Sequence, residues 1–316
     1  MTLGAVPSFS IVIPTYNRAR LLEDCLASVF AQRFSDYEVV IVDDGSTDDT
    51  AVVLARYAER VRVCRQPNLG PGAARNAGIG HARGRYVAFL DSDDLWFPWT
   101  LDVYARVICE GHDPAFVAGK PTQFRTPKAL RQVAETEPAT RRFNDYYASG
   151  DEWRWWGASS FVVRADVLAE VGGFTDEWIN GEDADLAMRL GVSVGFVQVC
   201  APFTFGYREH AGSAIASLDR THAGALHKLT TEKAGFYPGG RTRALERRRI
   251  LTRHFRPVML DCLRAGRQGD AWRLYRATFV WHLQAGRWRF LLGFPGLALA
   301  ALWRGGLTAE SPAAHP

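Results

Sequence analysis

The first hundred residues alternate short, uniformly apolar runs with stretches of helical periodicity. The apolar runs are FSIVIP (Phe9–Pro14), YEVVIVDD (Tyr37–Asp44) and RYVAFL (Arg85–Leu90). Runs of this kind are typical of strands that are buried on both faces. Apolar residues recur at helical spacing in Ala19–Arg33, and a Gly/Pro loop precedes another helical stretch at Gly72–His81. This alternation predicts an α/β fold with a doubly wound, mostly parallel sheet.

Polar residues stand at the end of each of these three strands. The first strand ends in Pro14, Thr15, Tyr16 and Asn17, the second in Asp43 and Asp44, and the third is followed by Asp91, Ser92, Asp93 and Asp94. In open parallel sheets, ligands bind beyond the carboxyl ends of the strands. We therefore expect these residues to converge on one ligand-binding edge.

The stretch FLDSDDLW places three carboxylates within four residues, directly after a buried strand. Like charges at this spacing repel one another, and burying them is costly unless a positive charge lies among them. Mg²⁺ or Mn²⁺ suits a pair of carboxylates together with ligand phosphates, and would supply that charge. A solvated turn that caps the following helix is the alternative interpretation.

The stretch NLGPGAARNAGIGHARG (Asn68–Gly84) is a Gly-rich loop followed by a helix, which could approach a phosphate closely. It contains neither G-x-G-x-x-G nor the P-loop Lys, which argues against a dinucleotide fold and a P-loop kinase. Arg75 and Asn76, one turn into the helix, could reach a base edge or a phosphate. Polarity of the helix surface explains them equally well.

Two further stretches carry candidate functional groups. In NGEDADLAMRLG, Glu182 and Asp183 fall in the first turn of a short helix, where they could stabilise the helix dipole or supply a general base. Arg189 on the same helix is interpreted as structural. In FGYREHAGS, Arg208 and His210 follow a strand and could cap a diphosphate and a metal ion.

Taken together, these motifs resemble the family 2 glycosyltransferases of GT-A fold. The resemblance covers roughly Ser8 to Ser217 and includes, in order, the stretches IVIPTYNRA, VVIVDDGSTDDT, NLGPGAARNAGI, FLDSDDLW, GEDADLAMRL and YREHAGS. The resemblance implies a GT-A type sheet and a nucleotide-sugar donor. It also implies inversion of configuration at the anomeric carbon.

The resemblance also implies roles for matching residues. The nucleotide pocket would be lined by Pro14, Thr15, Tyr16 and Asn17, with Asp43 or Asp44 accepting from the nucleobase imide and Arg75 and Asn76 nearby. Asp91 and Ser92 would contact the donor, Asp91 and Asp93 the metal, and Asp94 could substitute for Asp93. Asp183 would be the catalytic base with Glu182 as its neighbour, Arg208 would contact the diphosphate, and His210 would complete the metal or diphosphate site.

The expected reaction is transfer of a sugar from a nucleoside-diphosphate sugar, with UDP favoured, to a hydroxyl of a glycan or glycolipid acceptor in cell-surface polysaccharide, glycolipid or glycoconjugate synthesis. A nucleotidyltransferase that makes sugar nucleotides is one alternative. That class usually carries a Gly-rich basic loop after the first strand, where this chain has PTYNRAR. A non-catalytic nucleotide- or glycan-binding module is the other alternative, and the intact DSDD and GED stretches count against it.

Charge divides the chain into two parts. Residues 1–216 contain 21 Lys and Arg against 28 Asp and Glu, whereas residues 217–316 contain 17 against 6. We expect a catalytic domain at 1–216 and a basic helical region at 217–316. The last apolar run, Phe290–Trp303, has 14 residues, is interrupted by glycines and a proline, and is too short to span a bilayer. An interfacial anchor on an anionic membrane and a helical subdomain packed on the core remain alternatives, and nucleic-acid binding is disfavoured.

Cysteine usage and the N-terminal sequence bear on the compartment. The five cysteines are widely separated and form no C-x-x-C pair, which favours a reducing compartment over a disulfide framework or a zinc site. The N-terminal stretch lacks the pattern of a signal peptide. We expect a cytoplasmic protein, either free or peripheral on the cytoplasmic face of the membrane. The cluster Trp153, Trp155 and Trp156 could line a sugar site or fill the core.

Overall fold

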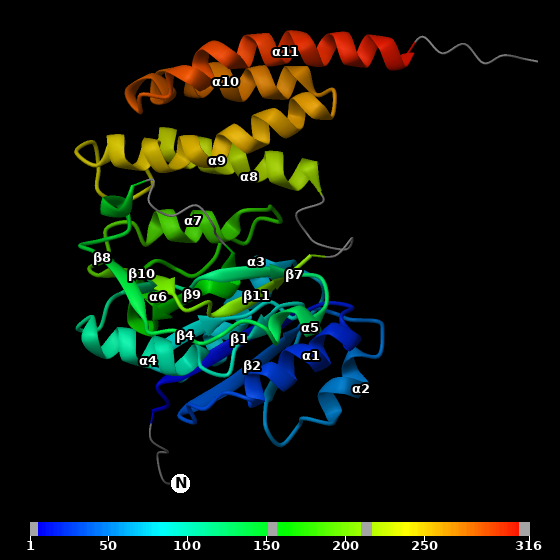
Figure 1. Ribbon diagram of the computed structural model, residues 1–316, viewed down its shortest axis with the longest axis vertical. Coiled ribbons are helices and arrows are strands. Elements are labelled where there is room, and N and C mark those ends of the chain that lie inside the picture. Colours follow the sequence, from blue (N-terminus) through cyan, green and yellow to red (C-terminus); the bar gives the residue numbers. More distant parts are fainter. Residues whose placement is uncertain (1–5, 151–156, 210–216, 310–316) are drawn as a thin grey trace, which may run out of the picture. The chain divides into compact units, whose positions relative to one another are not determined.

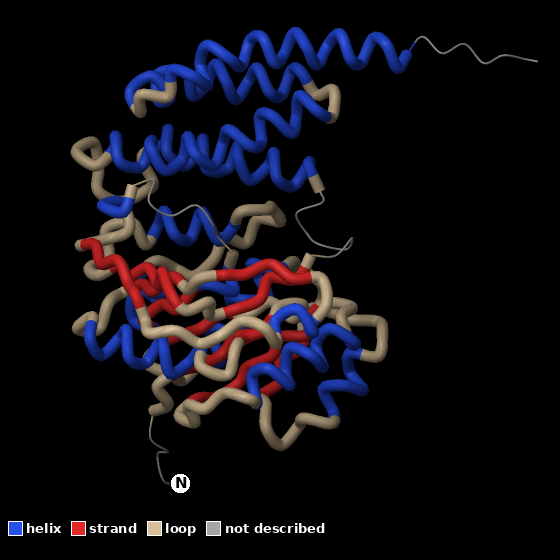
Figure 2. The backbone as a smooth tube through the Cα atoms, viewed as in Figure 1, coloured by secondary structure: helices blue, strands red, loops and turns tan. Residues whose placement is uncertain are grey.

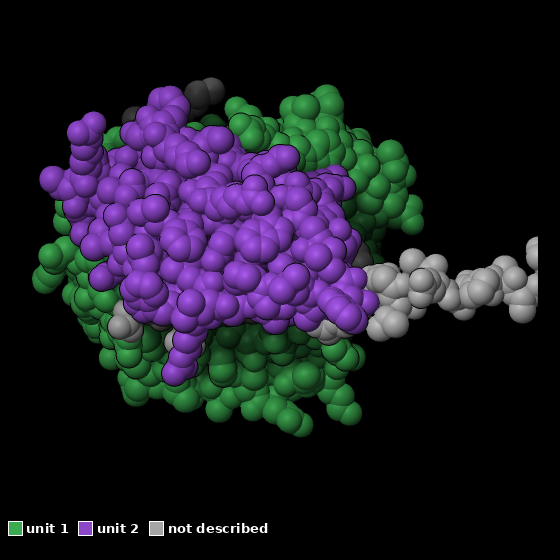
Figure 3. Space-filling model, turned by 90° about the horizontal axis from the view of Figure 1, so that it is seen from above, with its two compact units in different colours: residues 1–178, 182–213 green, residues 179–181, 214–316 purple. Residues whose placement is uncertain are grey.

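The computed structural model describes residues 6–150, 157–209 and 217–309. The chain divides into two compact units (Figure 1, Figure 3). Unit 1 comprises residues 1–178 and 182–213, and unit 2 comprises residues 179–181 and 214–316. The assignment of residues 1–216 to catalysis and of residues 217–316 to a basic helical region remains a prediction.

Within the described residues, unit 1 contains an eight-stranded sheet (Figure 2). Its strands are, in spatial order, β3 (Arg62–Arg65), β2 (Tyr37–Asp43), β1 (Phe9–Thr15), β4 (Tyr86–Phe89), β9 (Phe161–Arg164), β6 (Phe116–Ala118), β10 (Phe196–Ala201) and β8 (Ala139–Phe143). Strands β3, β2, β1 and β4 pair in parallel, as do β6 and β10. Strand β9 runs antiparallel to β4 and β6, and β8 runs antiparallel to β10. The expected mostly parallel α/β sheet is therefore confirmed.

The central strand β1 is buried along its whole length because its side chains are covered on both faces of the sheet. Ile11, Val12 and Ile13 have no exposed surface. Helix α3 (Pro71–His81) lies close enough to this strand that a Cβ at Gly78 would overlap a methyl group of Val12. The continuous apolar run in the sequence thus reflects a strand with no solvent-facing side.

Helices and a second sheet complete unit 1. The remaining helices are α1 (Ala19–Phe30), α2 (Thr50–Ala55), α4 (Thr100–Glu110), α5 (Pro127–Leu130), α6 (Ala165–Glu170) and α7 (Glu182–Arg189), with 3₁₀ turns η1 (Tyr147–Ser149) and η2 (Ala158–Ser160). The second sheet consists of β5 (Leu95–Trp96), β11 (Phe205–Arg208) and β7 (Pro121–Phe124). Its strand β5 follows the DSDD stretch directly, since β5 begins at the residue after Asp94.

Three segments are not evident from the local sequence pattern. The run 115–122 is divided between β6 and β7 in two different sheets, because the chain turns at Gly119, where a Cβ would overlap Tyr104 and Thr204. Strand β10 begins only at Phe196, after a turn at Gly195 with φ of +85°. Strand β8 has no apolar pattern, because most of its residues are exposed.

Unit 2 is built from four helices in the described part of the chain: α8 (Leu218–Ala234), α9 (Ala244–Arg264), α10 (Gln268–Gln284) and α11 (Trp288–Ala309). Helix α8 begins at an N-cap serine, Ser217, and ends at Gly235 in the left-handed conformation. A buried ion pair between Arg247 and Glu232, at 2.6 Å, links α9 to α8. Among the described residues, no helix combines the length and apolarity needed to cross a bilayer.

Candidate active site

The strand order of unit 1 brings the predicted polar residues to one edge of the sheet. Strand β1 lies between β2 and β4, and its last residue, Thr15, pairs with Asp43. The backbone N–H of Leu90 donates to Val12, so the DSDD stretch leaves the sheet at the same edge. The loops after β1, β2 and β4 are therefore neighbours, as expected for parallel strands.

Asn17 joins the loop after β1 to the loop after β2. Its side-chain oxygen accepts from the backbone N–H of Thr47 (2.8 Å), and its own N–H donates to Ser46 Oγ (2.9 Å). Its φ of +50° is a conformation that Asn tolerates better than most residues. Pro14 lies on β1, and Tyr16 exposes its ring beside this junction.

The buried hydroxyl of Thr15 has no hydrogen-bond partner within the described part of the chain. A buried hydroxyl without a partner is unusual in folded proteins, because its desolvation is then uncompensated. The edge of the sheet thus offers one polar atom that a ligand could satisfy.

The two aspartates after β2 have different partners. The carboxylate of Asp43 accepts from the backbone N–H of Ser46 (2.9 Å) and pairs with Arg65 (3.0 Å). The carboxylate of Asp44 accepts from the side chain of Gln66 (2.7 Å) and from the backbone N–H groups of Leu69 (3.0 Å) and Gly70 (2.9 Å). Asp44 therefore holds the Gly-rich loop in place, while Asp43 fixes the turn that follows β2.

The three carboxylates of the DSDD stretch lie in three different environments. Asp91 pairs with Arg75, and Asp93 lies 3.9 Å from Arg18; their side chains are 31% and 23% exposed, respectively. Asp94 is buried, where it accepts from Ser159 Oγ (2.6 Å) and from the backbone N–H of Arg208 (3.0 Å). Burial, and then the charges of Asp93 and Asp91, raise the pKa of Asp94 well above its usual value.

These contacts indicate that Asp94 supports the stretch from within, because it links β11 to the turn before β9. Asp91 and Asp93 are the members that can meet a ligand. Ser92, between them, is buried. The positive charge expected among these acids is supplied in part by the protein itself, through Arg75 and Arg18.

Arg75 is the central cation of this edge, and its contacts were not predictable from the sequence. One terminal nitrogen donates to Asp91 (2.6 Å) and the other to Glu182 at the start of α7 (2.7 Å). Burial by itself would lower the pKa of this guanidinium, but the two carboxylates outweigh that effect and raise it. Arg75 thereby connects α3, the DSDD stretch and α7.

Asn76 connects the same helix to the turn at Gly172–Phe174, which follows α6. Its amide nitrogen donates to the carbonyl of Phe174 (2.9 Å) and to Asp176 (3.0 Å), and its amide oxygen accepts from the N–H of Phe174 (2.7 Å). Arg75 and Asn76 both position neighbouring protein segments, and their expected place near the nucleotide stays a prediction.

The acidic residues of α7 make different contacts. Glu182 faces Arg75, whereas Asp183 accepts from the backbone N–H of Ala184 (2.6 Å) in the first helical turn. Arg189 pairs with the buried Asp185 (2.9 Å) and donates to the carbonyl of Val171 (2.8 Å). The structural interpretation of Arg189 agrees with these contacts.

Arg208 on β11 contacts the DSDD stretch from the other side. Its Nε donates to the carbonyl of Asp93 (2.8 Å), a terminal nitrogen donates to Asp24 on α1 (3.0 Å), and the guanidinium lies over the ring of Phe124. His210 lies outside the described residues, as do Trp153, Trp155 and Trp156.

The arrangement is compatible with a divalent cation. Among the described residues, no group of three His, Cys, Asp or Glu side chains is placed to hold a metal ion. Mg²⁺ and Mn²⁺ bound with a nucleotide need only one or two carboxylates, however, because phosphates and waters complete the coordination. Asp91 and Asp93 are partly exposed, one residue apart, and meet this requirement.

A mixed sheet with acidic loops at the carboxyl ends of its parallel strands defines a GT-A type domain, and solved structures share this fold. S. aureus TarS residues 1–349 align over 95% of this chain and 92% of that one, with a TM-score of 0.63 and 21% identity. The mannosyltransferase PcManGT of Pyrobaculum calidifontis, solved with GDP-Man and Mn²⁺, aligns with a TM-score of 0.50 and 20% identity over 94% of this chain and 88% of that one.

Residues 10–162, just under half of the chain, match the family model described as glycosyl transferase family 2. The resemblance inferred from the motifs is thereby confirmed. The uncharacterized glycosyltransferase YibD of Escherichia coli is 32% identical over 53% of this chain and 52% of its own length. Chondroitin synthase of Escherichia coli is 32% identical over 60% of this chain and 27% of its own. The chain spans about half or less of the curated relatives that it matches.

Proposed function

We propose that this protein transfers a sugar from a nucleoside-diphosphate sugar to a hydroxyl acceptor, with inversion at the anomeric carbon. The observation that carries the proposal is the bridge made by Arg75. One guanidinium spans Asp91, in the stretch suited to the donor diphosphate and metal, and Glu182, at the acidic start of α7. Asp183, the proposed base, follows Glu182 directly in the sequence, so the proposed donor site and base would lie near each other, which is the proximity that group transfer requires.

UDP is the favoured nucleotide of the donor. The supporting comparison is S. aureus TarS, which has been solved in complex with UDP-GlcNAc and with UDP. In this chain the nucleoside would lie at the junction of the loops after β1 and β2, where Tyr16 exposes its ring and the hydroxyl of Thr15 has no hydrogen-bond partner among the described residues. Asp43 and Asp44 would lie beneath it.

Asp91 and Asp93 would hold Mn²⁺ or Mg²⁺ together with the diphosphate. When bound, such an ion neutralises the charge that develops on the departing diphosphate. The protein's own residues prepare this position in two ways. Asp94 and Ser159 fix the backbone of the stretch, since the N–H of Asp91 donates to Ser159 Oγ (3.0 Å), and Arg75 orients the Asp91 carboxylate.

Asp183 would act as the general base that removes the proton of the acceptor hydroxyl as the new C–O bond forms. In the same first turn of α7, Glu182 pairs with Arg75 and Asp185 pairs with Arg189, so Asp183 is the carboxylate proposed as the base. Attack from the face opposite the departing diphosphate requires one base and inverts the configuration. The transition state would resemble an oxocarbenium ion, as in glycoside hydrolysis.

The acceptor class proposed is a glycan or glycolipid of cell-surface polysaccharide or glycoconjugate synthesis. The support comes from names of relatives: chondroitin synthase of Escherichia coli, and the succinoglycan biosynthesis protein ExoW of Rhizobium meliloti, which is 46% identical over 28% of this chain and 30% of its own.

Asp183→Asn tests the catalytic assignment. We expect transfer or donor hydrolysis with Mn²⁺ to fall at least about 100-fold, while UDP binding measured by calorimetry is retained. The matched control is Asp102→Asn, which changes an aspartate in the first turn of α4 and leaves transfer unchanged. Activity that survives in Asp183→Asn would show that Asp183 is not the base.

Asp93→Ala tests the metal assignment separately. We expect Mn²⁺-dependent UDP binding to weaken markedly, because a carboxylate that faces the diphosphate is lost. If calorimetric titration with Mn²⁺ and UDP gives the wild-type affinity, Asp93 does not bind the metal, whatever the outcome for Asp183.

A further inference from the structure

Helix α11 is fixed in unit 2 by one apolar face. Leu291, Phe294 and Ala298, at helical spacing, are buried. The ring of Phe294 stacks on Tyr275 of α10 at a centroid distance of 4.4 Å, and the Tyr275 hydroxyl donates to the carbonyl of Leu291 (2.8 Å). The rotation of α11 about its own axis is therefore set by contacts with α10.

Another face of α11 is also apolar and is exposed. We call this face the α11 stripe; it consists of Trp288, Leu292, Leu299 and Trp303. The intervals of four, seven and four residues align these side chains along the helix. All four are more than half exposed, with Leu292 at 79% and Trp303 at 78%.

The α11 stripe is unusual for a protein surface. A helix at the surface of a globular unit normally carries polar residues on its outer face. The run Phe290–Trp303 contains no charged residue. Contiguous exposed apolar surface of this kind marks an interaction site.

Basic residues flank this apolar run in the sequence. Arg287 and Arg289 precede it and Arg304 follows it in the sequence, and residues 217–316 contain 17 Lys and Arg against 6 Asp and Glu. The two tryptophans of the stripe stand near its two ends. Tryptophan prefers the boundary between lipid and water, and arginine is attracted to anionic headgroups.

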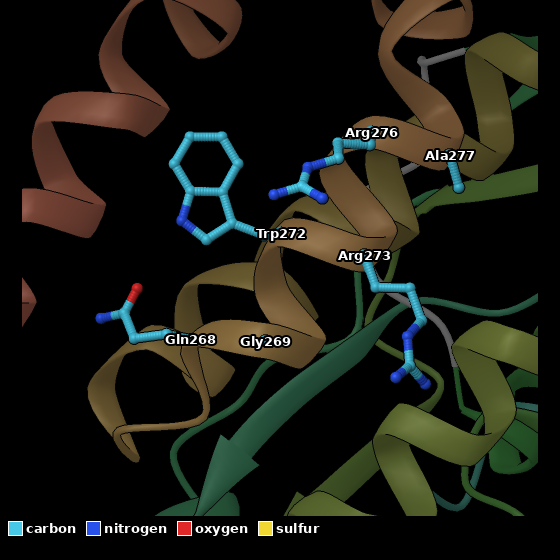
Figure 4. Close-up of a pocket in the computed structure, with 6 residues that line it drawn as sticks. All are labelled: Gln268, Gly269, Trp272, Arg273, Arg276 and Ala277. Atoms are coloured by element: carbon cyan, nitrogen blue, oxygen red, sulfur yellow. The ribbon is translucent and has the colours of Figure 1, made fainter.

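A basic groove of about 620 Å³ lies on α10, next to α11 (Figure 4). It is lined by Gln268, Gly269, Trp272, Arg273, Arg276 and Ala277. Figure 4 shows Trp272 and Arg276 near one another, and the guanidinium of Arg276 lies 5.8 Å from the centroid of the Trp272 ring. The groove adjoins α11 because the Trp272 ring packs edge-on against Phe294 (5.1 Å).

We propose that the α11 stripe and the basic groove form one surface that binds an anionic lipid bilayer, with α11 lying in the plane of the interface. The groove would accept phosphate headgroups through Arg273 and Arg276, while the stripe enters the acyl boundary. A second copy of the chain is a poorer occupant, because it would bring the same excess of positive charge to the contact. Since no described helix can span a bilayer, the association is peripheral.

The test is co-sedimentation of the full chain with two kinds of vesicle, one of phosphatidylcholine alone and one that also contains phosphatidylglycerol. We expect the wild-type protein to bind the second kind and to lose binding at high salt. Leu292→Glu and Leu299→Glu should each weaken binding about tenfold, because each removes an apolar side chain that would enter the acyl boundary and adds a negative charge that the anionic headgroups repel. Both residues are exposed, so folding should be unaffected, which far-UV circular dichroism checks.

Two matched controls separate this surface from general effects. Phe236→Glu alters another exposed apolar residue of unit 2 and should bind as the wild type does. Arg273→Gln combined with Arg276→Gln should weaken binding on the order of tenfold. The charge-matched pair Arg241→Gln with Arg264→Gln should weaken it less, because both residues lie outside the groove.

Wild-type protein that stays in the supernatant with phosphatidylglycerol vesicles would overturn the proposal. So would Leu292→Glu protein that sediments as the wild type does. If light scattering instead shows a wild-type dimer that Leu292→Glu converts to a monomer without change in vesicle binding, the occupant is a second copy. Vesicle binding is measured without donor or acceptor, so its outcome does not depend on the proposed transfer reaction.

Discussion

Replacement of Arg75 by Met removes the cation that stands between Asp91 and Glu182. Removing one partner of a fully buried ion pair costs about 3–5 kcal/mol, because the remaining charge is left without compensation. In this site the side chains of Asp91 and Glu182 are 31% and 12% exposed, so water can partly solvate them once Arg75 is gone. We therefore expect Arg75→Met to lower the free energy of unfolding by about 2 kcal/mol.

The matched control is Arg56→Met, which breaks the pair between Arg56 and Glu23 at 2.6 Å, where both side chains are well exposed. Exposed pairs contribute less than about 1 kcal/mol, so this variant should unfold almost as the wild type does. Urea denaturation followed by tryptophan fluorescence measures both. A double-mutant cycle of Arg75→Met with Glu182→Gln should give a coupling energy of about 1 kcal/mol.

Arg75→Met should also weaken UDP binding in the presence of Mn²⁺, because Asp91 loses the donor that orients it. If Arg75→Met costs no more stability than Arg56→Met, and the coupling with Glu182 is zero, Arg75 does not link the DSDD stretch to α7. The physical basis of the proposed active site would then be lost.

Two further variants test the packing of α3 and the acid sensitivity of unit 2. Gly78→Ala should destabilise the protein by about 1–3 kcal/mol, since its Cβ would overlap Val12, whereas Gly80→Ala on the same helix meets no neighbour within 4 Å and should be neutral or stabilising in the same urea titration. Burial, and then the charges of Arg287 and Arg256, lower the pKa of His282 from 6.5 to about 3. The unfolded chain therefore takes up this proton first, and stability falls as the pH drops below 6.5, by about 2 kcal/mol at about pH 5. His282→Phe should remove that part of the loss when urea midpoints are compared at about pH 8 and about pH 5; an unchanged pH dependence would show that His282 is not its source.

The fold could be predicted from the sequence where burial is complete on both faces of a strand. Strands β1, β2 and β4 produce unbroken apolar runs, and parallel pairing then places their polar ends together. Strand β8 could not be predicted, because one edge strand with exposed arginines has no periodic signal. The division of residues 115–122 between two sheets depends on the close approach of Gly119 to Tyr104, which no local pattern reveals.

The composition of the candidate site was predictable, but the division of tasks within it was not. In DSDD, the sequence could not say which aspartate is buried, because that depends on Ser159 and Arg208, far along the chain. The same holds for Asp44, whose partners lie 22 to 26 residues away. Glu182 and Arg75 are 107 residues apart, so their ion pair exists only in the folded chain.

The antiparallel direction of β9 allows side chains at the edge of the sheet to vary independently of the parallel strands. Strand β9 is antiparallel to its neighbours β4 and β6. Its first residues therefore lie at the edge of the sheet where β4 and β6 end. Ser159, just ahead of β9, reaches Asp94 for this reason. Residues just before β9 therefore approach this edge from a chain direction opposite to that of the loops after β1, β2 and β4. Substitutions just before β9 can alter the side chains at this edge without shifting the pairing of the parallel strands.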